Sequence, residues 1–192
     1  MEYYDEKIAL ARHIKRRDEY GNLEVGMYIK DELVKFEKKL ICQEKLEVML
    51  PENFVPMLPE IAEIKYMSGK RPEEIYMRLD TSVNFTFNYV QDLEPVSDMR
   101  LAAGFIKHII KSYHSDYVFY SESEEVEKDV IINWFDFKSF GIDDPAYNIM
   151  YVANIENKLL QGTFCCLYSE KDEWKRVALE VIKSVKAYEK EV

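Results

Sequence analysis

Residues 82–90 have the sequence Ser-Val-Asn-Phe-Thr-Phe-Asn-Tyr-Val, and this stretch decides the fold class. Apolar and polar side chains alternate along it, which is the period-two pattern of a β-strand. One face carries the apolar side chains of Val83, Phe85, Phe87 and Tyr89. The other face carries the polar side chains of Asn84, Thr86 and Asn88. We expect the apolar face to pack on a core and the polar face to be open or lightly covered.

Two helices are expected further along the chain, over residues 97–113 and after Ser169. In each, apolar side chains recur at steps of 3, 1, 3, 1 and 3, which places them on one helical face. The stripe of the first helix is Ala102, Phe105, Ile106, Ile109, Ile110 and Tyr113. The stripe of the second is Trp174, Val177, Ala178, Val181, Ile182 and Val185, and we expect it to pack on the sheet. Ser169 and Asp172 resemble a capping box at its start.

The remaining elements are predicted mostly as strands joined by short connections. Before residue 82 we expect a strand at 36–49, turns and short helical pieces around Pro51, Pro56 and Pro59, a strand at 62–67 and a helical turn at 71–74. After the first helix we expect strands at 117–123, 130–138, 147–155 and 159–168, with an acidic loop at 122–127 and a tight turn at 156–158. The strand at 130–138 is apolar on both faces, which is typical of a central strand covered on both sides.

This element order predicts an α+β protein with a twisted antiparallel sheet flanked by helices, because short turns join antiparallel strands. We divide the chain into an N-terminal extension, residues 1–33, and a main domain, residues 34–192. In the extension, every second residue at 23–29 is apolar. Ile8, Leu10 and Ile14 are separated by even numbers of residues, which would place them on the same face of a strand. Both patterns favour a β-hairpin. A short helix over residues 6–17 is the alternative.

Composition limits the function classes. The 192 residues carry 36 acidic and 26 basic side chains, a formal charge of −10, so a nucleic-acid-binding surface is not expected. The N-terminus lacks the pattern of a secretory signal, and no apolar run is long enough to span a membrane. The three cysteines, Cys42, Cys165 and Cys166, and the scattered histidines lack metal-ligand spacing. We therefore expect a cytoplasmic protein with reduced thiols and with no metal or other cofactor.

Several segments together resemble the Mog1/PsbP-like superfamily, nearest its bacterial DcrB-like and DUF1795 proteins. They are a strand followed by Leu-Pro-x-x-Phe at 47–54, the polar strand 83–89, the helix with Phe105 and Ile109, the aromatic strand 132–137, and the strand 160–166 followed by a helix near Trp174. The resemblance covers residues 36–192 and implies an α/β/α sandwich. Members of the superfamily mostly bind other proteins, namely a small GTPase, photosystem subunits or secreted effectors. Some DUF1795 members are cytoplasmic chaperones for apolar helices of secretion effectors.

Asp136 is the one residue that suggests an enzyme, since it lies in an apolar strand, on the same face as Trp134. A buried carboxylate must be paired, hydrogen-bonded or protonated, and such a group can act as a general acid or base. More often it caps a loop or pairs with an arginine such as Arg71 or Arg78. No phosphate-binding glycine loop and no nucleophile elbow occurs in the sequence, and apolar neighbours make Cys166 an inert thiol.

Three hypotheses of function follow. The first is a non-enzymatic protein-binding module, an adaptor or chaperone for a secreted or toxin-like protein. It would bury an apolar helix or extended segment of its partner on the open sheet face, with Asn84, Thr86 and Asn88 supplying polar contacts. The second is a self-associating structural subunit, a homodimer through the exposed strand edges of the N-terminal hairpin. The third is an enzyme that acts on a small molecule with Asp136.

Overall fold

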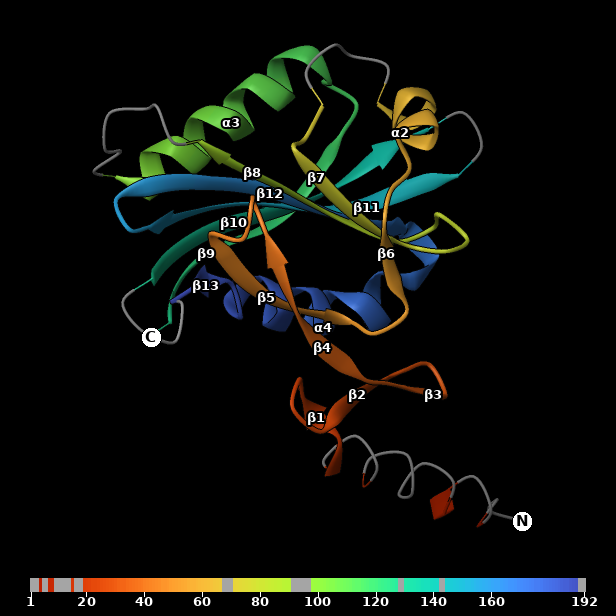
Figure 1. Cartoon of the computed structure of the whole chain (residues 1–192). Helices are drawn as coiled ribbons and strands as arrows, with labels where there is room; N and C mark the ends of the chain where they lie inside the picture. The colour runs from red at the N-terminus through yellow and green to blue at the C-terminus, as the bar shows by residue number, and fades with distance from the viewer. Residues whose placement is uncertain are drawn as a thin grey trace.

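A seven-stranded antiparallel sheet forms the centre of the protein (Figure 1). The structure is a computed structural model that describes Tyr4, Lys7, Ile8, Lys15 and residues 19–66, 71–90, 98–127, 130–141 and 144–189. In spatial order the strands are β6 (Phe54–Pro56), β7 (Glu74–Arg78), β8 (Asn84–Val90), β12 (Lys158–Leu167), β11 (Pro145–Ile155), β10 (Val130–Phe140) and β9 (Val118–Glu127). The predicted strand at 82–90 is confirmed as β8, in the interior of this sheet.

Helices cover both faces of the sheet, so the predicted α+β sandwich is confirmed. Helices α2 (Pro59–Lys65) and α3 (Met99–Tyr113) lie on one face (Figure 1). On the other face lie α4 (Lys171–Lys183) and a small sheet of β4 (Phe36–Ile41), β5 (Leu46–Pro51) and β13 (Lys186–Ala187). Among the described residues, no helix is long and apolar enough to span a membrane.

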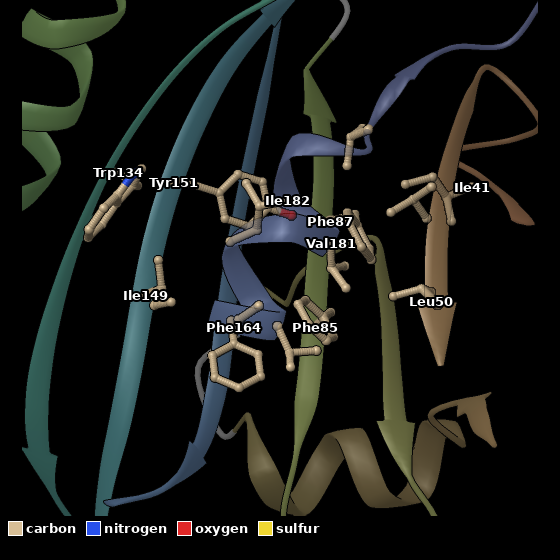
Figure 2. Close-up of a cluster of buried hydrophobic side chains, with 14 of the residues drawn as sticks. Ile41, Leu50, Phe85, Phe87, Trp134, Ile149, Tyr151, Phe164, Val181 and Ile182 are labelled. Atoms are coloured by element: carbon tan, nitrogen blue, oxygen red, sulfur yellow. The ribbon is translucent and has the colours of Figure 1, made fainter. Parts of the chain in front are cut away.

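The main core lies between the sheet and the α4 layer (Figure 2). Phe85 and Phe87 of β8 are buried against Val181 of α4 and Leu50 of β5. The whole predicted stripe of α4, from Trp174 to Val185, is buried here, as its spacing predicts. Burial of apolar side chains is the dominant favourable term in folding, so this layer supplies most of the stability.

The predicted strand at 36–49 is wrong, because the chain reverses within it. Strands β4 and β5 pair antiparallel, with Leu40 opposite Glu47 and Ile41 opposite Leu46. The reversal uses positive φ angles at three successive residues, Cys42, Gln43 and Glu44. None of the three is a glycine, so the sequence lacks the usual sign of a left-handed turn.

Two further predictions before β8 are wrong. Residues 59–65 form α2, with Pro59 in its first turn, where the missing N–H of proline costs nothing. The strand predicted at 62–67 is therefore helical up to Lys65, and Met67 lies outside the described residues. The helical turn predicted at 71–74 is absent, and Glu74 begins β7, which pairs with β8.

The strands after α3 agree better with the prediction. Glu156 and Asn157 form the tight turn between β11 and β12, both with positive φ angles, which suits a two-residue hairpin loop. Strand β10 is covered on both faces, although it lies beside the edge strand and not at the centre of the sheet. The acidic loop predicted at 122–127 is wrong, because these residues continue β9. The capping box is also wrong, since Ser169 lies in a 3-10 turn and α4 has no side-chain cap.

The N-terminal extension forms a small sheet of β1 (Gly21–Asn22), β2 (Gly26–Ile29) and β3 (Glu32–Val34). Strand β2 pairs with β1 on one side and, through a turn at Lys30 and Asp31, with β3 on the other. Ile8 is helical, and most of the predicted first arm, residues 8–14, lies outside the described residues. The division of the chain between residues 33 and 34 stays a prediction.

Candidate protein-binding surface

Helix α3 carries a line of exposed apolar side chains along one flank. Leu101, Phe105, Ile109 and Tyr113 are 71, 67, 37 and 80% exposed. They follow one another at a spacing of four residues, which places neighbours in contact along a helix. We call these four residues the α3 flank. Apolar side chains gathered in this way on a surface are typical of a site that another molecule covers.

The contacts of α3 show which way this flank points. Helix α3 packs on β10 and β11. Its residues Ala102, Ile106 and Ile110 form a line along the helix and are partly buried. Lys107 forms an ion pair with Glu122 of β9, and Lys111 lies over the ring of Phe119. At about 100° per residue, Lys107 projects from one side of this partly buried line, while Leu101, Phe105 and Ile109 project from the other side. Since Lys107 points toward the β9 edge, the flank points toward β12 and β8.

The polar face of β8 lies on that side, but two of its three predicted binding residues are buried. Asn84 is 0% exposed, and its amide oxygen accepts a hydrogen bond from the Tyr66 hydroxyl at 3.0 Å. Thr86 is 3% exposed, and its hydroxyl oxygen accepts from the Thr163 N–H at 2.9 Å. The predicted open face is therefore wrong at both positions. Asn88 is partly exposed, and a binding role for the three residues stays a prediction.

Asp136 is 1% exposed and has three hydrogen-bond donors. Its carboxylate accepts from the Tyr147 hydroxyl, the Lys175 ammonium and the Ser121 N–H, each at 2.6 Å. A bulge in β9 opposite Asp136 brings the Ser121 N–H into this position. Burial and the neighbouring carboxylate of Asp136 raise the pKa of the Tyr147 hydroxyl, which keeps it protonated as a donor.

The predicted partner of Asp136 is wrong, because the cation is Lys175 and neither Arg71 nor Arg78. Arg71 pairs with Glu63, and Arg78 pairs with Asp80. The three donors around Asp136 match a structural role, which links β9, β10, β11 and α4. Asp136 also lies in the wall of neither of the two cavities described below.

A cavity of about 380 Å³ lies between the N-terminal sheet and the main domain. Lys30, Arg78, Phe54 and Trp174 are in its wall. Both cations face the buried carboxylate of Glu170, Lys30 at 2.6 Å and Arg78 at 3.9 Å. Because their charges are compensated within the protein, the cavity marks an ion-paired contact between the extension and the main domain.

The sequence places Phe105, Ile109 and Tyr113 in a helical stripe but does not show that they are exposed, and Leu101 is not part of that stripe. Their spacing of four was visible in the sequence. With Leu101 included, the apolar positions of α3 extend over more of its circumference than one sheet contact covers. That surplus is the signal that an exposed apolar flank was present.

Comparisons with known proteins show the fold alone. No family model and no curated protein matches the chain. Cyanobacterial PsbP (CyanoP) from Synechocystis sp. PCC 6803 is 13% identical, with a TM-score of 0.58 over 85% of this chain and 99% of that one. LpqN of Mycobacterium tuberculosis, described as involved in cell envelope biogenesis, is 10% identical, with a TM-score of 0.53 over 88% of this chain and 98% of that one.

A third structure, from Bacteroides thetaiotaomicron VPI-5482, is 12% identical, with a TM-score of 0.51 over 80% of this chain and 49% of that one. The predicted DcrB-like or DUF1795 relationship stays a prediction, since none of these structures is described as either. The agreement with PsbP and LpqN extends over almost the whole of both of those chains. The chain therefore has the fold of the PsbP/Mog1-like superfamily.

Proposed function

We propose that this chain is a non-enzymatic protein-binding module. An apolar helix or extended segment of a partner protein binds to its α3 flank and covers it. The exposure of Leu101, Phe105, Ile109 and Tyr113 carries this proposal. An apolar segment laid along the flank would remove these side chains from water, which is favourable in proportion to the apolar area covered. Partly exposed polar groups beside it, among them Asn88 and Gln161, would hydrogen-bond the partner's backbone.

The finer role that we propose is that of an adaptor or chaperone for a secreted or toxin-like protein. The family resemblance favours it, since several members of this superfamily bind proteins. A cytoplasmic location stays a prediction. The hypothesis of an enzyme that uses Asp136 is not favoured, because three donors already occupy that carboxylate.

The test is a tagged pull-down from the native cell, with every recovered protein quantified by mass spectrometry. The variant Phe105→Ser/Ile109→Ser removes half of the α3 flank. Phe105 is 67% and Ile109 is 37% exposed, so we expect a native circular dichroism spectrum and a loss of stability too small to unfold the protein. The control is Leu79→Ser, which removes a 73% exposed leucine from the turn between β7 and β8.

The proposal predicts one stoichiometric partner with the wild-type chain and with Leu79→Ser. Phe105→Ser/Ile109→Ser should recover about a tenth as much of it, or less, as expected when two central contacts of an interface are removed. Equal recovery by the flank variant and the control would contradict the proposal. A bait that returns alone as a defined oligomer would also contradict it, in favour of the self-associating subunit.

A further inference from the structure

The outer edge of β9 is available for a further strand. Strand β9 pairs with β10 on one side, and within the described chain no strand pairs with its other side. Its ten residues are mostly exposed. An edge strand presents a row of unpaired N–H and C=O groups, which is a template for another strand. At the opposite edge, β6 has three residues and ends at Pro56, which has no N–H.

Glutamates lie on both faces of this edge. Glu122 and Glu124 are opposite Phe135 and Asn133 of β10, on the α3 side. Glu125 and Glu127 lie on the opposite face of the strand and project toward α4, where Lys183 forms an ion pair with Glu125 at 3.5 Å. Lys107 pairs with Glu122. In the described part of the protein, Glu124 and Glu127 form no ion pair, and Glu124 accepts a hydrogen bond from the Asn133 side-chain amide at 3.1 Å.

The acidic edge continues into an acidic groove at Glu127. This second cavity is an open groove of about 1760 Å³ between the ends of β10, β11 and α4. Seven glutamates line it: Glu24, Glu44, Glu47, Glu127, Glu156, Glu180 and Glu189. Its three lysines are all paired, Lys38 and Lys186 with Glu47, and Lys183 with Glu180 and Glu125. The negative charge of the edge therefore extends past the end of the strand.

We propose that β9 accepts a lysine- or arginine-rich extended segment of a partner protein as an eighth strand of the sheet. Every second side chain of a strand lies on the same face, so alternating cations on such a segment would face either Glu122 and Glu124 or Glu125 and Glu127, while its backbone pairs with the free edge. A second copy of β9 does not fit, because like charges placed opposite each other destabilise a strand pair. This surface is separate from the α3 flank, so the inference stands or falls independently of the proposed function.

The probe is a ten-residue peptide that alternates lysine with valine or threonine, which matches β9 in length. A matched peptide carries the same lysines with proline between them, and so keeps the charge but cannot pair as a strand. Binding to the full chain is measured by fluorescence anisotropy at about 0.05 M and about 0.5 M salt, since salt screens exposed charges. Hydrogen exchange with and without the lysine–valine/threonine peptide shows which amides it protects.

The variant Glu124→Lys/Glu127→Lys reverses the charge of one glutamate on each face of the β9 edge. The control Glu60→Lys/Glu63→Lys changes the net charge equally on α2, at exposed positions on the other side of the protein. We expect the edge variant to bind the lysine–valine/threonine peptide about ten-fold more weakly, and the control to change affinity less than about two-fold. New protection from exchange should be confined to residues 118–127 and their immediate neighbours.

Three results would overturn the inference. The first is equal binding of the proline peptide, which would show attraction by charge without strand pairing. The second is an equal loss of affinity in the control, which would show a non-specific effect of net charge. The third is failure of the lysine–valine/threonine peptide to bind at low salt, which would show that the glutamates only protect the edge from pairing.

Discussion

The hydroxyl of Tyr151 on β11 donates a hydrogen bond to the backbone carbonyl oxygen of Thr86 on β8, at 3.1 Å. The two strands are not neighbours, because β12 lies between them. The phenol crosses β12 at Gly162, which is opposite Tyr151 on one side and Phe87 on the other. A Cβ at Gly162 would lie 2.2 Å from the Tyr151 hydroxyl oxygen and 2.3 Å from the Thr86 oxygen. The absence of a side chain at residue 162 therefore allows this link across three strands.

Gly162→Ala should destabilise the protein, because the added methyl group displaces the Tyr151 ring and breaks its hydrogen bond. We expect a loss of about 3 kcal/mol in the free energy of unfolding, as in other overpacked cores. Urea denaturation measures it. The control is Gly104→Ala in α3, where a Cβ meets nothing within 4 Å. That change should stabilise the protein by about 0.5–1 kcal/mol through helix propensity. Equal effects of the two substitutions would contradict this account of Gly162.

The Asp136–Lys175 pair should contribute to stability as a unit. Asp136→Asn removes a buried charge that Lys175 and Tyr147 contact, and we expect it to cost about 3 kcal/mol. Lys175→Met leaves the buried carboxylate without its cation. The double variant should be more stable than the sum of the two losses predicts, with a coupling of about 1–2 kcal/mol. Strictly additive losses in urea denaturation would show that the pair is not coupled.

Cys42 should be unreactive in the folded protein. Burial, with smaller contributions from the nearby Glu74 and Glu73 carboxylates, raises the pKa of its thiol to about 12. A raised pKa keeps the thiol neutral below that value, so at pH 8 its thiolate fraction is on the order of a thousand-fold lower than in the unfolded chain. Iodoacetamide labelling at pH 8 with peptide mapping should modify Cys42 slowly when folded and rapidly in denaturant. Equal rates in both conditions would contradict the burial of this thiol.

The two long helices should respond differently to loss of a large apolar side chain. Trp174 of α4 is 2% exposed, so Trp174→Ala should cost about 3–5 kcal/mol in unfolding free energy. Leu101 of α3 is largely exposed, and Leu101→Ala should change stability by less than about 0.5 kcal/mol. Thermal and urea denaturation of both variants measure this. A large loss for Leu101→Ala would mean that α3 packs more closely than the structure shows.

Elements with a regular pattern of their own could be predicted from the sequence. The alternation at residues 82–90 predicted β8, and the stripe from Trp174 to Val185 predicted both α4 and its buried face. In both cases a single local period determines the backbone and the side that is buried. The turn at residues 42–44 could not be predicted, because it contains no glycine, asparagine or aspartate. Cys42, Gln43 and Glu44 reverse the chain inside an apolar pattern that otherwise continues from β4 to β5.

The candidate surface could be predicted only in part, for a physical reason. The period of α3 predicts a helix, but the face that it buries depends on where the helix lies over the sheet. Ala102, Ile106 and Ile110 are partly buried where α3 packs on β10 and β11, while Phe105 of the same stripe is 67% exposed. The burial of Asn84 likewise depends on Tyr66, which follows α2 and is 18 residues away in the sequence. Such tertiary contacts leave no local pattern.

The central claim is that a partner protein covers the α3 flank, and site-specific photo-crosslinking in the native cell tests it most directly. A photoreactive phenylalanine analogue replaces Phe105 in one strain and Leu79 in a control strain. Since both positions are exposed, neither substitution should disturb folding. The account predicts one discrete crosslinked product of higher mass from position 105, identified by mass spectrometry, and none from position 79. No product from position 105, or the same product from both positions, would contradict it.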